Sequence, residues 1–256
     1  MYPQQLGAFA GAYAGLGLAA LSAVAADSIS KSRRFQLFGR MVSRVNTTQR
    51  CIALTFDDGP NPPFTERILD VLSAYNARAT FYLLGRYVDR HKGTASAIVG
   101  AGHEVGNHGY SHRRLVMRSP EFIKREIAVT DRALRTIGVT GEITFRAPNA
   151  RKLLVLPYTL ASMRKLHVLF DVLPEPSDYF GAPADVVSDF VLSRVRPGSI
   201  VVLHDGTHDG WRDRANVVAA TRLVLQRLIE QDYTFLRVDE LLRLSTTRVA
   251  DGTIHA

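Results

Sequence analysis

Residues 51–60 read CIALTFDDGP, an apolar run that ends in two adjacent carboxylates and a Gly-Pro pair. The apolar part, residues 51–56, is typical of a buried strand, and Gly59-Pro60 marks a turn directly after it. In folds that alternate strands and helices, the carboxyl ends of the strands carry the active site. Asp57 and Asp58 would stand at that edge, where one carboxylate could bind a metal while the other faces a substrate. An Asp-Gly turn with solvated acids is the alternative for this stretch taken alone.

Six further short apolar runs follow along the chain, at residues 79–84, 103–107, 142–145, 166–172, 199–203 and 233–238. Amphipathic helical patterns lie between most of them, at residues 64–75, 120–137, 184–195 and 215–228. The pattern at 120–137 has Ser119 as a favourable N-cap and Gly138 as a stop. Strands that alternate with helices indicate a parallel sheet with crossover helices. Seven strands predict a small or incomplete β/α barrel, with an open doubly wound sheet as the alternative.

The composition is that of a globular protein large enough to bury a substantial core. The chain has 256 residues, of which 46% are hydrophobic and 22% are charged. Its formal net charge of +8 excludes an acidic solvating chain. The single cysteine, Cys51, excludes an internal disulfide framework and any cysteine-rich zinc finger. The sequence contains neither a G-x-S-x-G elbow nor a G-x-x-x-x-G-K-[ST] loop, which argues against an α/β-hydrolase and a P-loop protein.

The first 26 residues contain no Asp, Glu, Lys or Arg. Residues 6–26 are small and apolar, and roughly 20 such residues span a bilayer as a helix. We therefore expect residues 1–26 to form an N-terminal transmembrane or signal helix. The A-x-A sequence at residues 23–25 favours a cleaved signal, whereas the lack of Lys and Arg in residues 1–5 favours an uncleaved anchor.

A basic linker is expected at residues 27–47. Six Lys or Arg and one Asp lie between residues 27 and 50, so this stretch carries most of the net charge. Such a cluster beside an apolar span is attracted to anionic headgroups, which makes the membrane an expected partner. Taken literally, the positive-inside rule would place the rest of the chain in the cytoplasm. Because the basic residues cluster here and no aromatic-basic strand follows, nucleic acid is not an expected partner.

Two histidines four residues apart follow the apolar run at 103–107. His108 and His112 would fall on one face of a helical turn, the spacing that binds zinc in other proteins. With Asp58 they would supply two nitrogens and one oxygen and leave a position open, as catalytic metal sites do. A structural pair of histidines is the alternative. His103, His167 and His208 are expected to be structural or surface residues.

Two further polar groups follow apolar runs. His204 ends the run VVLH, where a side chain with an ordinary pKa of about 6.5 suits acid or base catalysis. Arg146 follows the run at 142–145, where a guanidinium could hold a carboxylate bidentately or form an ordinary surface ion pair. Residues 175–179, EPSDY, indicate only a loop.

Taken in order, TFDDGP at 55–60, HGYSH at 108–112, Arg146, the Asp178-Tyr179 pair and LH at 203–204 resemble the polysaccharide deacetylases with a NodB homology domain, carbohydrate esterase family four. The resemblance covers residues 48–245, which are expected to form the catalytic domain, and leaves residues 246–256 as a tail. It implies a distorted (β/α)7 barrel. It also implies a metal-dependent hydrolase that removes N-acetyl groups from N-acetylglucosamine-containing saccharides, such as peptidoglycan, chitin oligomers or a lipid-linked sugar.

The resemblance implies a role for each matching residue. Asp57 resembles the catalytic base and His204 the catalytic acid. Arg146 resembles the arginine that orients the base, and Asp178 the aspartate that tunes the acid. Leu203 matches the apolar residue that lines the acetyl pocket. The metal ligands would be Asp58, His108 and His112. Zn²⁺ is the expected metal, and Co²⁺ or Ni²⁺ would also fit this ligand set.

Two expected substrate contacts depart from the family pattern. Asn149 stands where the third motif usually has an aromatic residue, although its backbone N–H could still serve an oxyanion hole. The apolar surface that an aromatic residue would offer a sugar is missing there. Tyr179 stands where tryptophan is usual and would still wall an apolar pocket, with less area. These departures concern the identity of the substrate more than metal binding.

Two alternatives to a deacetylase remain open. One is an O-acetyl esterase or a deformylase that acts on another carbohydrate with the same metal site. The other is a non-catalytic saccharide-binding module, although the metal ligands and both acid/base residues are all present. For location, the family favours a membrane-anchored domain of the cell envelope, whereas the basic flank favours a cytoplasmic-facing one, and a secreted form is the third case. The sequence makes no prediction of oligomeric state.

Overall fold

The computed structural model describes residues 22–174, 178 and 181–250. Its central strand is β2 (Cys51–Asp57), in which every residue is buried. β3 (Thr80–Leu83) and β6 (Ile200–His204) pair with it in parallel, and β7 (Thr234–Phe235) pairs in parallel with its first two residues. β4 (Glu104–Asn107) extends the sheet beyond β3. Because β2 has neighbours on both edges and helices outside, its sequence is apolar almost without alternation.

A second parallel pair is formed by β1 (Met41–Val42) and β5 (His167–Val168). Single bridges connect this pair with the larger sheet, and they join Asn107 to Phe145, Phe145 to His167, and Val172 to Val201. Strand neighbours therefore run in a ring from β2 through β3, β4, β5 and β6 back to β2. The expected α/β class with parallel sheets is confirmed, and this ring of neighbours is what a distorted barrel would show.

The four expected helices are present with slightly different ends. They are α2 (Phe64–Ala74), α5 (Pro120–Thr136), α7 (Ala184–Leu192) and α8 (Ala215–Ile229). As expected, the hydroxyl of Ser119 caps α5 by accepting a hydrogen bond from the Phe122 N–H at 3.3 Å. The expected strand at 142–145 is reduced to the bridge at Phe145, and only His167–Val168 of the run at 166–172 is regular strand.

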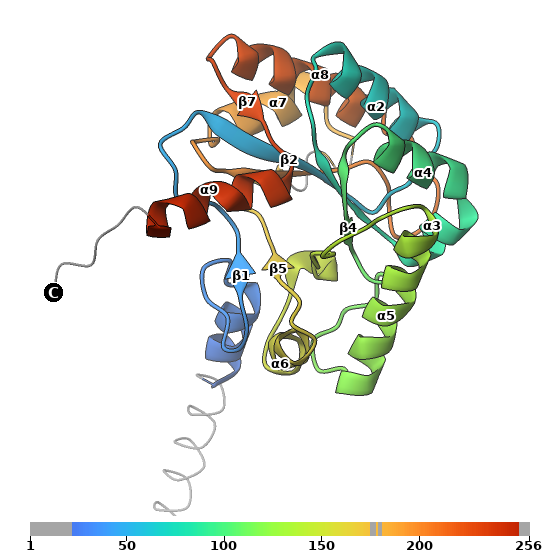
Figure 1. Ribbon diagram of the computed structural model, residues 1–256, viewed down its shortest axis with the longest axis vertical. Helices are drawn as coiled ribbons and strands as arrows, with labels where there is room; N and C mark the ends of the chain where they lie inside the picture. The colour runs from blue at the N-terminus through green and yellow to red at the C-terminus, as the bar shows by residue number, and fades with distance from the viewer. Residues whose placement is uncertain (1–21, 175–177, 179–180, 251–256) are drawn as a thin grey trace, which may run out of the picture.

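Four helices were not expected: α3 (Gly85–Arg90), α4 (Lys92–Gly100), α6 (Val155–Ser162) and α9 (Val238–Ala250). α3 has only six residues, and α4 reads KGTASAIVG, with a glycine near each end. α6 reads VLPYTLAS, which is too uniformly apolar to show a helical period. In Figure 1, α2, α4, α3 and α5 lie along one side of the strands.

Part of the expected linker is built into the fold. A helix over residues 22–31 precedes β1, and the Arg151 guanidinium forms an ion pair with Asp27 at 2.8 Å. Lys152 donates a hydrogen bond to the carbonyl of Ser32. Val45 is buried, and its N–H donates to the carbonyl of Gly198 at 2.9 Å. The described part of residues 27–47 is therefore packed against the domain expected to begin at residue 48.

Most of the expected transmembrane or signal helix falls on residues 1–21, which lie outside the described residues. Within the part of the chain that the structure describes, no helix has both the length and the apolar character needed to cross a membrane.

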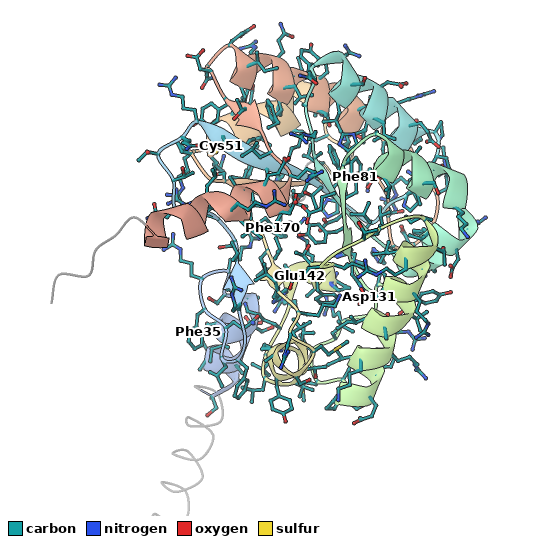
Figure 2. The ribbon with its side chains drawn as sticks, in the orientation of Figure 1. Phe35, Cys51, Phe81, Asp131, Glu142 and Phe170 are labelled. Carbon is teal, nitrogen blue, oxygen red and sulfur yellow. The ribbon has the colours of Figure 1, made fainter. Side chains whose placement is uncertain are left out.

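Alternate residues of β2 face two different apolar clusters. An outer cluster, shared with α2, α7 and α8, takes Ile52, Leu54 and Phe56. An inner cluster takes Cys51 and Ala53, together with Phe170. Figure 2 labels Cys51 and Phe170 of the inner cluster and Phe81 of the outer one, whose ring stacks on Phe56 at 4.9 Å between centroids.

The same alternation places the end of β2. Side chains along a strand point to opposite faces in turn, so Thr55 and Asp57 share the inner face with Ala53. Asp57 pairs in register with His204, the last residue of β6. The carboxyl ends of the two central strands therefore bring an aspartate and a histidine together inside the ring of strands.

Candidate active site

Asp57 and Asp58 are both buried, with exposed fractions of 3% and 1%. Asp57 ends β2, and Asp58 follows with a φ of 71°, in the left-handed region. That region is costly for most residues, but aspartate tolerates it better than they do. The turn separates the two carboxylates, so that Asp57 stays on the inner face of β2 while Asp58 meets the histidines that follow β4.

The three expected metal ligands lie together. Asp58 Oδ1 is 3.4 Å from His108 Nε2 and 3.2 Å from His112 Nε2. One ligand atom from each of the three residues can be chosen so that all lie within 4.8 Å of one another, and the three side chains are at most 6% exposed. Asp58 Oδ1 has no hydrogen-bond donor among the described residues. A buried carboxylate oxygen without a donor is costly, and a bound cation would relieve that cost.

The orientation of His108 is set by its other nitrogen. Its Nδ1 lies 2.9 Å from the carbonyl oxygen of Arg146, so Nδ1–H donates there and Nε2 is the nitrogen that faces Asp58. Metal-binding histidines almost always have such an outer partner, which fixes the tautomer. The donor set of Asp58, His108 and His112 therefore fits a divalent metal.

The loop that carries both histidines is not the helical turn expected from their spacing. Gly109 has a φ of 81° and His112 a φ of 59°, so the backbone turns out of the helical region twice. Glu126 of α5 fixes the loop: its Oε2 accepts hydrogen bonds from the N–H groups of Tyr110 and Ser111 at 3.0 and 2.9 Å. The histidines converge through this buried carboxylate and not through helical periodicity.

Charge and burial act in opposite directions on the metal-site residues. Burial lowers the pKa of His112 to about 3, although Asp58 acts to raise it. Burial would raise the pKa of the Asp58 carboxyl, but His112 and His108 together hold it below its usual value. The site therefore contains a carboxylate beside a neutral His112 imidazole, which is the protonation state that a metal ligand needs.

Arg146 is fully buried and fixes Asp57. Its Nη1 donates to Asp57 Oδ1 at 2.6 Å and to Thr55 Oγ1 at 2.7 Å. The other guanidinium nitrogens donate to the carbonyls of Val168 and Leu169, and the group lies 3.9 Å above the ring of Tyr82. The bidentate contact that the sequence suggested does not form, because the remaining donors are used by the backbone. Asp57 Oδ2 is left on the side of His108, at 3.8 Å from its Nε2.

His204 is paired with Asp178. The His204 Nδ1 lies 2.8 Å from Asp178 Oδ2, and Asp178 is fully buried. The carbonyl of Asp178 accepts hydrogen bonds from Arg214 at 3.0 Å and from Asn216 at 3.3 Å, which position it. Burial alone would lower the pKa of His204, but the Asp178 carboxylate, with smaller contributions from Asp58 and Asp57, raises it to about 10. His204 therefore carries a proton at neutral pH.

The expected substrate contacts are placed less uniformly. Leu203 belongs to the outer cluster and faces the helices, because it alternates with His204 along β6. Its neighbour Val202 belongs to the inner cluster and shares the face of His204, so the structure places Leu203 on the opposite face of β6 from the expected acetyl pocket. Asn149 is exposed in a left-handed conformation, with a φ of 58°. Tyr179 lies outside the described residues.

Sequence reasoning missed a set of hydrogen bonds beside the Asp58 turn, which joins Asp205 to Thr65 and Asn61 and is called the Asp205 clamp below. Asp205 is fully buried, and its Oδ2 accepts a hydrogen bond from Thr65 Oγ1 at 2.5 Å. Burial raises the pKa of Asp205 to about 7. Asn61 Nδ2 donates to the carbonyl of Asp205 at 3.0 Å. The one signal in the sequence was a second polar residue after the apolar run of β6.

Replacing Gly59 by alanine is expected to disturb this clamp. A Cβ at Gly59 would lie 2.2 Å from Asp205 Oδ2, and the carboxylate cannot retreat from its bond to Thr65 without loss. Overpacking of this kind costs about 1–3 kcal/mol, which urea denaturation would measure as a lower midpoint. Gly93→Ala in α4 is the matched control, because a Cβ there meets nothing within 4 Å. Equal midpoints for the two variants would contradict the clamp.

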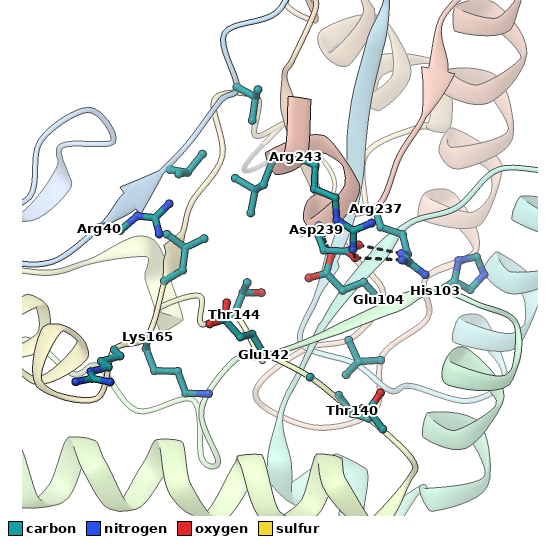
Figure 3. Close-up of a pocket in the computed structure, with 18 of the residues that line it drawn as sticks. Arg40, His103, Glu104, Thr140, Glu142, Thr144, Lys165, Arg237, Asp239 and Arg243 are labelled. Atoms are coloured by element: carbon teal, nitrogen blue, oxygen red, sulfur yellow. Dashed lines mark hydrogen bonds and ion pairs between the residues drawn. The ribbon is translucent and has the colours of Figure 1, made fainter. Parts of the chain in front are cut away.

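A cavity of about 1200 Å³ lies at the other end of the strands (Figure 3). Its lining includes His103 and Glu104 at the start of β4, and Lys165 just before β5. Because the strands are parallel, the cavity lies at their amino-terminal ends, opposite Asp57 and His204 at their carboxyl ends. None of the expected site residues lines it.

The fold is of the α/β class, and the site has a fixed carboxylate and a protonated histidine beside a candidate metal site. This combination is typical of a hydrolase. Comparison with known families agrees: the polysaccharide deacetylase family model matches residues 44–168. Among curated proteins, the chain is 32% identical over 205 residues to the peptidoglycan-N-acetylglucosamine deacetylase of Bacillus cereus, which covers 80% of this chain and 94% of that protein. This chain belongs to the polysaccharide deacetylase family and is a hydrolase of that kind.

Two further relatives show the same similarity. The chitooligosaccharide deacetylase of Sinorhizobium fredii is 34% identical over 194 residues, covering 72% of this chain and 89% of that protein. The structure of the peptidoglycan deacetylase PdaC from Bacillus subtilis superposes with a TM-score of 0.70 at 31% identity, covering 81% of this chain and 96% of that one. The expected family is therefore confirmed at the level of both sequence and fold.

Proposed function

We propose that this protein is a divalent-metal-dependent hydrolase that removes N-acetyl groups from N-acetylglucosamine-containing saccharides. One observation carries the proposal: Asp57, held by Arg146, and His204, held by Asp178, stand in register at the ends of β2 and β6. Asp57 Oδ2 is 3.8 Å from Nε2 of His108 in the cluster of metal-type ligands, and His204 interacts electrostatically with His112 of the same cluster. The named activities of the relatives from Bacillus cereus and Sinorhizobium fredii support the substrate class.

Asp58, His108 and His112 would hold the metal. When bound, a divalent ion would polarise the acyl carbonyl and lower the pKa of a water molecule at the site. Two imidazole nitrogens and one carboxylate oxygen suit Zn²⁺, and Co²⁺ or Ni²⁺ would also fit. The buried Asp58 oxygen without a donor and the neutral His112 ring support this assignment.

The chain's own residues would move the protons. Asp57 would take a proton from the attacking water while the water oxygen bonds to the acyl carbon. The proton would go to Oδ2 of Asp57, because Arg146 occupies Oδ1. His204 would give its proton to the amide nitrogen as the carbon–nitrogen bond breaks. The products are acetate and a free amino sugar, and the backbone N–H of Asn149 is our candidate donor to the developing oxyanion.

Replacing Asp178 by asparagine tests the role of the acid. The Asp178 carboxylate raises the pKa of His204, so its removal should let His204 lose its proton at lower pH. The alkaline limb of the kcat/KM profile should therefore move down by about 1 to 3 pH units. Rates at pH 9 should fall more than rates at pH 6. Asp232→Asn, at an exposed carboxylate, is the control, and an unmoved limb in Asp178→Asn would show that this limb does not report His204.

A panel of substrates tests the reaction itself. Acetate and formate release would be measured from N-acetylated chitooligosaccharides, peptidoglycan fragments, an O-acetylated saccharide and an N-formylated amino sugar. We expect acetate from the N-acetylated saccharides. Formate release alone would support the deformylase, release from the O-acetylated saccharide alone would support the esterase, and no release by protein with metal bound would support a saccharide-binding module.

We also propose that residues 1–26 attach the catalytic domain to a membrane. The support is the uncharged apolar sequence of this segment and the basic residues that follow it. A cell-envelope position fits a peptidoglycan substrate, whereas a cytoplasmic-facing domain would fit a lipid-linked sugar. Protease accessibility in intact cells, or a reporter fused to the C-terminus, would identify the side. Recovery of the whole protein in a salt-washed soluble fraction would contradict attachment.

A further inference from the structure

The chain has a single tryptophan, Trp211, and it is 67% exposed. It lies in the loop of residues 205–214, which connects the catalytic end of β6 with α8. A tryptophan side chain buries about 150–250 Å² when it is covered, so leaving its indole in water forgoes a large hydrophobic gain. An exposed indole beside an active site therefore suggests a surface that a ligand covers.

The indole is held in place and is not a loose surface group. Its Nε1–H donates to the carbonyl of Pro62 at 3.1 Å, and its ring centroid is 5.8 Å from that of Phe64, which is 4% exposed. Asn61 Nδ2 ties the loop down by donating to the carbonyl of Arg212 at 2.9 Å. These contacts are made with the segment directly after the Asp57-Asp58 turn. An aromatic surface fixed before binding loses little entropy when a ligand covers it.

The same loop also contacts the candidate metal site. The ring of His208 stacks on that of His112, with centroids 4.6 Å apart and planes at 20°. Arg86 of α3 donates to the carbonyl of His208, which fixes this part of the loop. Trp211 is three residues further on, so its Cα lies within about 11 Å of that of His208. One loop therefore joins the site of chemistry to the exposed indole at the same edge of the fold.

We propose that Trp211 is a saccharide-stacking platform that binds a sugar ring of the substrate chain two or more rings away from the ring that loses its acetyl group. The proposal rests on the proposed deacetylase function and deepens it, because it assigns an oligosaccharide or polymer as the substrate. A pyranose ring presents an apolar face of C–H groups, and the indole is the largest flat surface that a side chain offers to such a face. The exposed, polar Asn149 provides no such surface at the position where the family usually has an aromatic residue.

Kinetics with substrates of two lengths test the platform. Trp211→Ala should raise KM for an N-acetylated chitopentaose by about three- to tenfold and leave kcat within about twofold of wild type. KM for chitobiose should change little, because a short substrate does not reach the indole. Trp211→Phe, which keeps a flat ring, should recover part of the loss. Tyr158→Ala, at an exposed aromatic residue on α6, is the control.

A purely structural role for Trp211 would give a different result. Removing a loop support would displace His208 and lower kcat for both substrates, and this outcome would overturn the platform. Equal KM values for wild type and Trp211→Ala with chitopentaose would also overturn it. Absence of acetate release by the wild type from every substrate would instead count against the proposed function, and the kinetic test would then be replaced by binding.

Tryptophan fluorescence provides that binding test, because the only indole of the chain is the proposed platform. Titration of the whole protein with chitopentaose should shift the emission to shorter wavelength as the sugar excludes water, and chitobiose should have a smaller effect. An emission unchanged by saccharides would overturn the proposal. A shift with anionic lipid vesicles and none with chitopentaose would overturn it too, because the indole would then serve as a membrane contact.

Discussion

Asp57→Asn is expected to lower acetate release by about 10²- to 10⁴-fold and to leave the metal content of the purified protein at the wild-type level. The substitution keeps the shape of the side chain and an oxygen for the Arg146 contact, but it removes the group that would take the proton. Asp57 is not part of the Asp58, His108 and His112 cluster, so the donors for the metal remain. The buried Arg146 keeps its hydrogen bonds to Thr55 and to two backbone carbonyls, so the guanidinium stays hydrogen-bonded after it loses its charged partner.

Asp58→Asn is the matched comparison for Asp57→Asn. An amide is a much poorer metal ligand than a carboxylate, so Asp58→Asn should lose both the metal and acetate release. Metal content by elemental analysis and acetate release would be measured on the same preparations, purified without chelator. Unchanged acetate release from Asp57→Asn would refute its assignment as the base. Loss of metal from Asp57→Asn would instead place Asp57 among the ligands.

Arg146→Met is expected to lower the free energy of unfolding by about 3–5 kcal/mol and to abolish acetate release. Methionine fills part of the same volume but leaves Asp57 buried without its ion-pair partner at 2.6 Å. It also frees the carbonyls of Val168 and Leu169, which accept from the guanidinium. Breaking a buried ion pair is costly because the remaining charge has neither water nor a partner.

An exposed Arg–Asp pair in the same protein serves as the control. Arg151 pairs with Asp27 at 2.8 Å, and the two side chains are 33% and 50% exposed. Arg151→Met should therefore lower stability much less than Arg146→Met does. Urea denaturation of both variants gives the comparison. Equal losses of unfolding free energy in the two variants would mean that the contribution of Arg146 to stability does not come from its burial.

The edge of the sheet that carries the candidate site could be predicted because its signals are local in the sequence. Asp57, Asp58 and His204 each follow an apolar run directly, and parallel strands bring their carboxyl ends to one edge whatever the details of the fold. The family resemblance assigned Arg146 to the base and added Asp178, and the structure places them against Asp57 and His204. The roles of these residues in catalysis remain predictions for the variants described above.

Errors arose where local spacing does not determine geometry. The spacing of His108 and His112 suggested a helical turn, but Glu126, fourteen residues away on α5, shapes the loop through hydrogen bonds. Leu203 was assigned to the pocket from its place beside His204, although strand alternation turns it outward. Counting back two residues from His204 along the strand reaches Val202, which lies on the same face as His204.

Three residues that the sequence did not place in the site belong to one loop after β6. Asp205, His208 and Trp211 were not expected in the site, since each acquires its meaning from a distant partner. These partners are Thr65, His112 and Pro62, which lie between 96 and 149 residues away in the chain. No periodicity or short motif reports such contacts, because they depend on how the loops pack across the ends of the strands.

The central claim, a metal-dependent deacetylase, is tested most directly by acetate release during metal titration. The protein would be freed of metal with a chelator, dialysed, and titrated with Zn²⁺ in the presence of an N-acetylated chitooligosaccharide. The expected result is no release without metal, followed by a rise that saturates at one ion per chain. Full acetate release from the metal-free protein, or none after one ion per chain has bound, would contradict the claim.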